Sequence, residues 1–193
     1  MPVKTPHVAR RIILALIAVL LLLVIAWVGT SDNPFAQGVQ ELVGWKHDQG
    51  IVDNPFTLSP RNFRYYKFAL PQGATRVSIV GQFNAASDAH SSRKTSEPDA
   101  DNNIEVYVLS EPAFTIWQNG YAATTVYESG RVSQGTMQAE LPPGAGIYYL
   151  VFSNKFAPKS AKNVNADVLL HYKNWMPDSF RRVGERLWNW LGV

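Results

Sequence analysis

The pattern of apolar and polar positions divides the chain into three regions with different periods. Residues 12–28 are apolar without a break, residues 51–172 alternate with a period near two, and residues 177–193 carry apolar side chains at helical spacing. This order predicts a membrane-spanning helix, then a β domain, then an amphipathic helix at the C-terminus.

The first region has the length and the flanking charges of a single-pass anchor. Twenty uncharged residues lie between Arg11 and Asp32, and a helix of that length spans about 30 Å. Because Arg10 and Arg11 precede the run, the positive-inside rule places residues 1–11 in the cytoplasm and the main domain outside. Trp27 falls at the expected outer interface of a helix over 12–31. A cleaved signal peptide is the alternative, since a basic start and an apolar run fit both.

A short helix is predicted directly after the anchor, within residues 32–50. Asn33 and Pro34 make a good N-cap and first helical position. The apolar residues that follow fall on one side of this helix: Phe35, Val39, Leu42, Val43 and Trp45. We expect Phe35 and Trp45 to lie at the outer membrane surface. A linker turn packed under the domain is the alternative.

Residues 51–173 are predicted to form an antiparallel β-sandwich of the jelly-roll kind, with seven or eight short strands and no helix between them. The candidate strands are 65–70, 75–84, 103–110, 124–128, 133–141, 146–154 and 164–172, with a weaker one at 51–57. The run 146–154 is apolar on both faces, which predicts a central strand that is covered on both sides. The polar insertion 84–103 predicts a mobile surface loop.

Charge and composition exclude several classes of protein. The formal net charge is +3, but residues 12–176 hold twelve basic against thirteen acidic side chains, so they offer no basic footprint for a nucleic acid. The chain has no cysteine, which excludes disulfides, thiol nucleophiles and cysteine-ligated metals. It also has no Asn-x-Ser/Thr acceptor. These absences suit a bacterial periplasm at least as well as a eukaryotic lumen.

The stretch 142–172 carries a series of short motifs. In order along the chain these are a Pro/Gly turn, Gly146, the pair Tyr148-Tyr149, the strand end Phe152-Ser153-Asn154, Lys162 and an alternating strand from Val164. The series resembles the closing strands of GOLD domains, the β-sandwich of the p24 cargo-receptor family. The resemblance implies a sandwich with an interaction role, and a strand-end position for Asn154 whose side chain bonds a loop backbone. The chain departs from that family because it lacks the sandwich disulfide and places its membrane helix first.

The insertion holds the best candidate metal ligands. Asp99, Asp101 and Asn103 have the alternate spacing with which a calcium loop begins. The positions that should hold glycine and an acid are Ile104 and Ser110, so a solvated acidic turn is the simpler interpretation.

Other chemistry is equally incomplete. Asp88 and His90 make a two-ligand fragment, whereas a structural zinc site needs four ligands. Ser129 lacks the Gly-x-Ser-x-Gly elbow of a nucleophile, and His171 is expected on the polar face of the last strand beside Asp167. The sequence therefore predicts no catalytic residue, no metal site and no cofactor.

Two aromatic groups remain as candidate binding surfaces. Trp117, Tyr121 and Tyr127 are candidates for a carbohydrate groove, with packing in the core or on a sheet face as the alternative. In the C-terminal helix, residues 174–193, five apolar side chains fall within one arc: Phe180, Val183, Leu187, Trp190 and Leu191. We expect this face to dock on a partner subunit at the membrane surface, with adsorption to lipid and packing on the chain's own sandwich as alternatives.

These features predict a non-catalytic single-pass protein of the bacterial inner membrane. Its partners would be the lipid bilayer and integral-membrane protein subunits, and neither nucleic acid nor a small-molecule substrate is expected. We expect an accessory or stabilising subunit of a larger membrane complex, for instance a respiratory or photosynthetic one. A membrane-anchored binding module for a glycan, lipid or peptide is the alternative, and an extracytoplasmic enzyme comes third.

Overall fold

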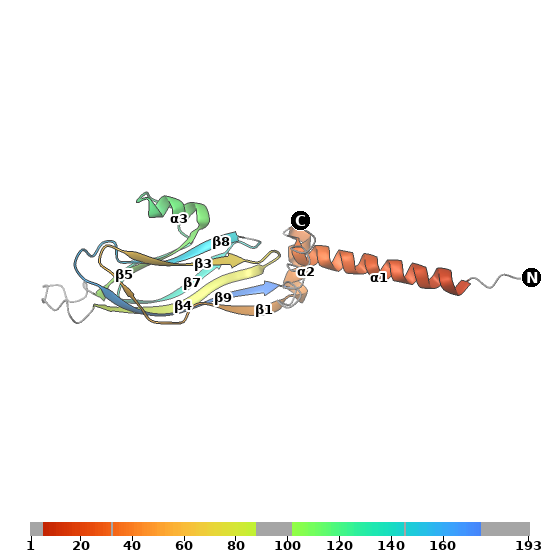
Figure 1. The fold of residues 1–193 in the computed structure, drawn as a ribbon, viewed down its shortest axis with the longest axis horizontal. Helices are drawn as coiled ribbons and strands as arrows, with labels where there is room; N and C mark the ends of the chain where they lie inside the picture. The colour runs from red at the N-terminus through yellow and green to blue at the C-terminus, as the bar shows by residue number, and fades with distance from the viewer. Residues whose placement is uncertain (1–5, 32, 88–101, 145, 175–193) are drawn as a thin grey trace, which may run out of the picture.

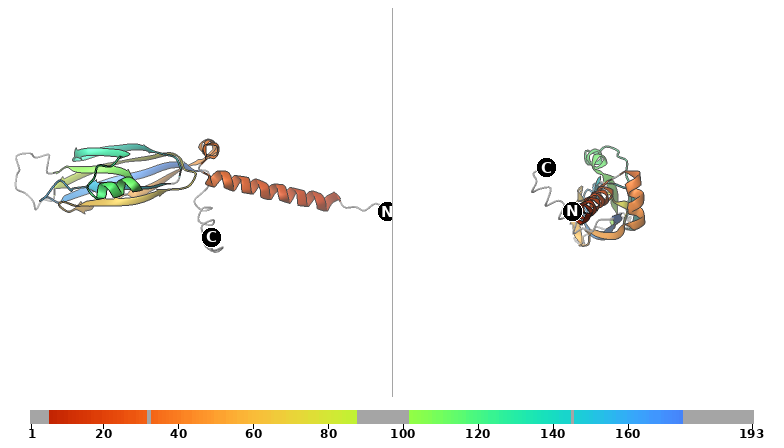
Figure 2. Two further views of the ribbon diagram at one scale, coloured as in Figure 1. Left: turned by 90° about the horizontal axis from the view of Figure 1, so that it is seen from above. Right: turned by 90° about the vertical axis from the view of Figure 1, so that its right-hand side faces the viewer.

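The computed structural model describes residues 6–31, 33–87, 102–144 and 146–174. A long helix, α1 (Pro6–Thr30), extends from one end of a β-sandwich along its long axis, and a short helix, α2 (Pro34–Val43), lies across the junction (Figures 1 and 2). The segment Arg10–Val28 of α1 has a mean hydropathy of 3.0 and is long enough to cross a membrane. A membrane anchor and a signal sequence share this length and composition.

The sandwich consists of two antiparallel sheets. One sheet has the order β1-β9-β4-β7, with the short strand β2 also paired to β9, and the other has the order β3-β8-β5-β6. The strands of the first sheet are β1 (Trp45–Val52), β2 (Phe56–Leu58), β4 (Thr75–Ser87), β7 (Gln134–Leu141) and β9 (Lys162–Asn174). Those of the second are β3 (Phe63–Leu70), β5 (Ile104–Ser110), β6 (Tyr127–Val132) and β8 (Gly146–Ser153). The fold class is mainly β, as predicted.

Alternation along the strands builds the core between the sheets. In β4 the side chains of Val77, Ile79 and Phe83 point inward and are almost completely buried. In β9 the inward set is the predicted one: Val164, Ala166, Val168, Leu170 and Tyr172. Because a strand has a period of two, the intervening polar residues face solvent. The period-two pattern of the sequence therefore identified the correct inner face.

Strand β8 is buried on both faces because a helix covers its outer side. Tyr148, Leu150 and Phe152 point into the core between the sheets, whereas Tyr149 and Val151 belong to a second apolar cluster under α3 (Glu111–Gln118). Figure 1 shows α3 lying over the outside of the sheet that contains β8. The predicted central strand is confirmed.

The prediction of no helix between the strands is wrong at α3. Ser110 ends β5 at the N-cap position, and Glu111 and Pro112 form the first turn. An N-cap serine followed by an acid and a proline is a recognisable helix start, and Ala113 and Trp117 lie four residues apart on the face that packs on β8. This signal was available in the sequence and was missed because residues 103–110 continue so clearly as a strand.

Other boundaries also differ from the prediction. The helix after the anchor ends at Val43, and the sandwich begins with β1 at Trp45 rather than at residue 51. Strand β4 continues through Ser87, so the first residues of the predicted loop 84–103 are part of the sheet. The rest of that loop lies mostly outside the described residues. The strand expected at 124–128 is β6, Tyr127–Val132.

Asn154 holds the end of β8 to the neighbouring loops, as predicted. Its side-chain amide donates to the carbonyl oxygens of Ser160 (2.8 Å) and Ser59 (3.2 Å), and its backbone N–H donates to Asn62 O at 2.8 Å. Lys162, also fully buried, begins β9 nearby and donates from Nζ to Ser160 Oγ at 2.9 Å. A buried polar group is stable only when it is hydrogen-bonded, so these contacts fix the loop geometry at this end of the sandwich.

Candidate functional site

The junction between α1 and the sandwich is short and ordered by specific contacts. Three residues separate α1 from α2, and Gly44 alone separates α2 from β1. The side-chain oxygen of Asn33 accepts the backbone N–H of Ala36 at 2.8 Å, which caps the first turn of α2 as the sequence predicted. Ala36 itself is completely buried. Helix α2 is therefore a fixed elbow between the long helix and the sandwich.

Glu41 connects α2 to the two long central strands. Its carboxylate lies 2.5 Å from Nη2 and 2.7 Å from Nε of Arg76 in β4, and its backbone carbonyl accepts from Lys173 Nζ of β9 at 3.1 Å. Both members of the ion pair are about half exposed, so the pair itself contributes only about 0.2–1 kcal/mol. Together the two contacts set the angle at which α2 meets the sheet.

Arg76 has a left-handed backbone, with φ of 48°. It lies at the irregularity between Thr75 and Ser78 where the β4·β9 register shifts. A non-glycine residue in this region costs about 1–2 kcal/mol, so the surrounding contacts must hold it there. The bulge re-aims the arginine side chain toward Glu41 on α2.

Large apolar side chains remain exposed around the elbow. Phe35 is 70% exposed, Leu42 85% and Trp45 71%, whereas the neighbouring Ala36 is buried. Phe35 and Leu42 are seven residues apart, which places them on one face of α2. These residues form the junction surface: Phe35, Leu42, Val43 and Trp45.

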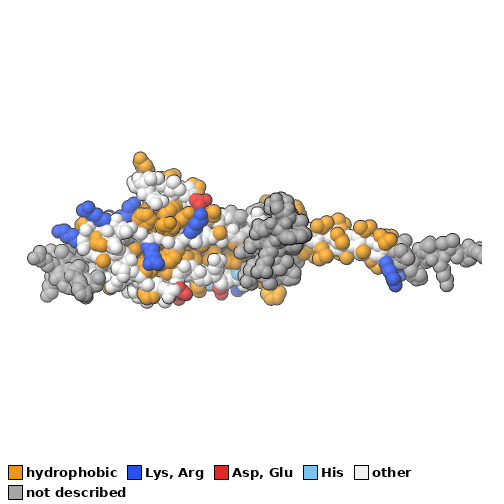
Figure 3. All heavy atoms as spheres, in the orientation of Figure 1, with side chains coloured by type: hydrophobic (Ala, Val, Ile, Leu, Met, Phe, Trp, Pro, Cys, Tyr) orange, Lys and Arg blue, Asp and Glu red, His pale blue; other side chains and the backbone are white. Residues whose placement is uncertain are grey.

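The predicted membrane-interface residues are all exposed. Trp27 is exposed near the end of α1 that adjoins α2, whereas Arg10 and Arg11 are exposed toward the other end of the helix. Figure 3 shows α1 as an almost entirely apolar rod with basic side chains near its far end. A helix that crosses a bilayer shows this arrangement, and a signal sequence shares it.

The aromatic residues near α3 form a packed layer. The ring of Phe114 stacks on Tyr149 with centroids 4.0 Å apart, and Trp117 meets Phe63 edge to face at 5.0 Å. Lys155 Nζ lies 4.5 Å from the Trp117 ring centroid, a cation–π contact. Figure 3 shows the apolar side chains gathered on this side of the sandwich with basic groups at their border.

The carbohydrate groove suggested for Trp117, Tyr121 and Tyr127 is not formed. Trp117, on α3, packs against the outer cluster, whereas Tyr127 packs against the core between the sheets and donates from its hydroxyl to Thr136 O at 3.3 Å. Tyr121 is 72% exposed after the end of α3. The three rings therefore lie in three different environments and do not line one groove.

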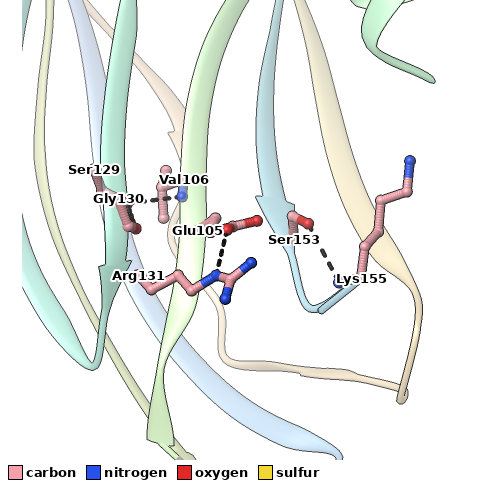
Figure 4. A network of polar contacts seen from close by, with 7 residues as sticks. All are labelled: Glu105, Val106, Ser129, Gly130, Arg131, Ser153 and Lys155. Carbon is pink, nitrogen blue, oxygen red and sulfur yellow. Dashed lines mark hydrogen bonds and ion pairs between the residues drawn. The ribbon is translucent and has the colours of Figure 1, made fainter. Parts of the chain in front are cut away.

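Ser129 has a structural role in a bulge of β6. Its Oγ accepts the backbone N–H of Val106 at 2.8 Å and donates to the carbonyl of Gly130 at 2.7 Å (Figure 4). Gly130 has φ of 65°, and the β5·β6 register shifts between Glu105 and Tyr107, so Val106 is not paired with a β6 residue in the ladder. The hydroxyl replaces the missing ladder bond.

Burial and two neighbouring acidic groups shift the pKa of one tyrosine near the bulge. Burial raises the pKa of Tyr107, and the negative charges of Glu105 and Glu128 raise it further. Arg131 Nε donates to Glu105 Oε1 at 2.9 Å and so balances one of these charges (Figure 4). The tyrosine stays protonated near neutral pH, which suits its place in the outer cluster.

No cluster of three His, Asp or Glu side chains suitable for a metal occurs in the described ranges. The candidates Asp99, Asp101, Asp88 and His90 lie outside those ranges. His171 lies on the outer face of β9, as expected. Its Nδ1 is 2.5 Å from Oδ1 of Asp48 on the neighbouring strand, rather than beside Asp167.

The predicted docking face of the C-terminal helix, Phe180, Val183, Leu187, Trp190 and Leu191, also lies outside the described residues. Its point of departure is defined, because Asn174 at the end of β9 pairs with Trp45 at the start of β1. Asn174, the last described residue, therefore lies beside Trp45 of the junction surface. The structure brings this attachment point together with Trp45, which sequence spacing alone could not do.

Together the fold and the junction define an antiparallel β-sandwich carried on an apolar N-terminal helix. No family model and no curated protein matches the chain. Among solved structures, a low-affinity xylan-binding module of class CBM86 from Roseburia intestinalis is similar over 67% of this chain and 86% of its own, with 18% identity and a TM-score of 0.30. FlhE is similar over 68% of this chain and 96% of its own, with 14% identity and a TM-score of 0.27. TM-scores this low assign no function, and the resemblance to GOLD domains stays a prediction.

Proposed function

We propose that the chain is a non-catalytic single-pass membrane protein that docks on integral-membrane partner proteins. Its sandwich lies on the outer side of a bacterial inner membrane, and the chain acts as an accessory or stabilising subunit of a larger complex. The observation that carries this proposal is the short, contact-locked junction between α1 and β1.

The junction favours docking over tethering. A module that searches for a ligand gains reach from a long flexible linker. Here three residues and then one residue separate the elements, and Glu41 ties the elbow to both β4 and β9. The anchor therefore holds the sandwich at one height and in one orientation, which suits contact with a neighbour that is itself fixed in the bilayer.

The junction surface fits the outer interface of the membrane. Phe35, Leu42 and Trp45 expose apolar and aromatic side chains at the end of α1 that faces away from Arg10 and Arg11. Aromatic side chains are enriched at this depth of a bilayer. Burying such a side chain contributes roughly 1.5–3 kcal/mol, so lipid contact at these positions stabilises the upright orientation.

The C-terminal segment supplies the partner contact in this proposal. Because Asn174 pairs with Trp45, residues 175–193 leave the sandwich at the height of the interface. The predicted apolar face with Leu187 and Trp190 is then within reach of a membrane neighbour. Aromatic anchors of this kind commonly dominate interface energies.

The test is co-purification of the full chain from its native membrane in a mild detergent. Deletion of residues 177–193, or the double change Leu187→Ser with Trp190→Ser, should release the partners while the protein stays in the membrane fraction. The matched control is Glu185→Ser with Asn189→Ser on the predicted polar face, which should retain them. If the deletion variant recovers the same partners at full yield, docking through the C-terminal segment is wrong.

A further inference from the structure

The outer face of the first sheet carries an ordered array of polar side chains on three adjacent strands. Register places Gln82 of β4 opposite Thr136 of β7 on one side and Asp167 of β9 on the other. Two residues along, Asn84 lies opposite Gln134 and Asn165. We call these six residues the amide array: Gln82, Asn84, Gln134, Thr136, Asn165 and Asp167.

The amide array lines a hollow of about 410 Å³. All six side chains are exposed, and among the described residues no hydrogen bond or ion pair engages their polar side-chain atoms. The side chains of Phe83 and Ala166, which alternate with them, point into the core. The hollow is therefore bounded by hydrogen-bonding groups that the protein itself leaves available.

The chemistry of the lining restricts the ligand. No Lys, Arg or His lines the hollow, which disfavours an anion, and a single carboxylate does not make a cation site. The apolar side chains in the lining, Phe83 and Ala166, are almost completely buried, so a lipid tail finds little apolar side-chain surface there. Four amides, one hydroxyl and one carboxylate offer many donors and acceptors at nearly neutral charge. Neutral sugar hydroxyls, which both donate and accept, match this set.

We propose that the amide array is a binding site for a neutral carbohydrate chain. A volume of about 410 Å³ lies within the usual range of ligand sites, roughly 300–1,000 Å³. The six side chains project from the face of the sheet and not from the backbone edge of its outermost strand, β7, whereas an extended peptide is bound most directly along such an edge through backbone hydrogen bonds. The face geometry therefore favours sugar rings over a peptide.

The location of the array also suits a polymer outside the membrane. β4 starts at the junction, next to the Arg76 contact with α2, and Gln82 follows Thr75 by seven residues. At about 3.3 Å per residue the array lies roughly 23 Å along the strand from the membrane-side end. A long polymer reaches this height without contacting the bilayer.

Affinity should be low, because the hollow offers hydrogen bonds and no aromatic ring for stacking. Each hydrogen bond contributes modestly against water, so we expect a Kd on the order of 1 mM. The probes are three neutral oligosaccharides of six units, β-1,4-linked glucose, mannose and N-acetylglucosamine. Each is titrated into the full chain in lipid nanodiscs, with binding followed by saturation-transfer NMR on the sugar.

The chain provides a matched pair of variants. Gln134 and Gln138 are both exposed glutamines on the outer face of β7, but only Gln134 lines the hollow. Gln134→Ala and Asn84→Ala should weaken binding about three- to tenfold, the usual effect of one hydrogen bond. Gln138→Ala should leave it unchanged. Unaltered melting temperatures would show that the exposed changes leave the fold intact.

Two results would overturn the proposal. One is the absence of saturation transfer from the wild-type chain to all three oligosaccharides at 10 mM, on the order of ten times the expected Kd. The other is an equal loss of binding in Gln134→Ala and Gln138→Ala, which would place the sugar elsewhere. An uncharged Gly-Ser hexapeptide that binds through Gln134 when no sugar does would instead assign the hollow to a peptide. None of these outcomes depends on the docking proposal.

Discussion

Truncation of Phe152 to alanine tests the central position of β8. The side chain is completely buried and lies edge to face with Phe56 at 5.1 Å, with Tyr66 at 6.1 Å and with Phe83 at 6.4 Å. Phe56 and Phe83 belong to the opposite sheet, so the ring joins the two sheets. Phe→Ala in a core costs about 3–5 kcal/mol, and aromatic pairs add roughly 0.5–1.5 kcal/mol each. We therefore expect the upper part of that range, about 4–5 kcal/mol.

The same strand provides a contrast on its outer face. Tyr149 is 8% exposed and stacks on Phe114 of α3, a short helix that can shift toward the space left by a truncation. Tyr149→Ala should therefore cost less, about 3 kcal/mol, because a site that can collapse leaves a smaller cavity. Tyr121→Ala, at a ring that is 72% exposed, should cost under about 0.5 kcal/mol.

The assay is urea unfolding of the full chain in non-ionic micelles, followed by tryptophan fluorescence. Equal slopes against urea for wild type and variants allow midpoints to be compared as free energies. For a domain of this size 1 kcal/mol corresponds to about 3–4 °C in Tm, so Phe152→Ala should melt roughly 12–20 °C lower. A cost below about 1 kcal/mol at both Phe152 and Tyr149 would refute the central position of β8. Equal losses of stability in Phe152→Ala and Tyr149→Ala would refute the expectation that α3 shifts into the space left at Tyr149.

Three further predictions concern the bulge, a close strand approach and pH. Ser129→Ala should cost about 1–3 kcal/mol in urea unfolding, because the Val106 N–H loses its acceptor, and the wild-type serine should not react with a fluorophosphonate probe. Gly81→Ala should cost at least about 1–3 kcal/mol by the same assay, since its Cβ would clash with the backbone of β9 and lie 2.8 Å from Val168 Cα. Burial raises the pKa of Tyr107, so its contribution to stability is complete below about pH 10 and is lost as pH rises further; unfolding at pH 8 and pH 11 should show this fall, and Tyr107→Phe should reduce it.

Sequence periodicity was sufficient for the sandwich because both sheets obey a strict alternation. Val77, Ile79 and Phe83 of β4 are separated by even numbers of residues, so they share one face. The apolar residues on both faces of β8 predict that another element covers the outer face of this strand. The cover itself was missed. Helix α3 is only eight residues long, too short for the helical period to stand out from the strand that precedes it.

The candidate surfaces show the limits of the sequence more clearly. The amide array joins residues from three strands that are about fifty and thirty positions apart, and only strand order and register bring them into one face. The contact of Glu41 with Arg76 depends on a bulge in β4, and the sequence around Arg76 does not predict this bulge. By contrast, Phe35 and Trp45 were identified because exposed aromatics beside an apolar run are a local property.

The pairing of β1 with β9 has a mechanical consequence. In the described chain the sandwich is linked to α1 through α2 and the first residue of β1, so a pull on the far end of the domain is transmitted to α1 along that strand. Seven residue pairs join β1 to β9 in antiparallel register, with their hydrogen bonds perpendicular to the strands. A force along the strand therefore loads these bonds in shear, so that they share the load and must fail together. This geometry resists the separation of β1 from β9 when the far end of the domain is pulled.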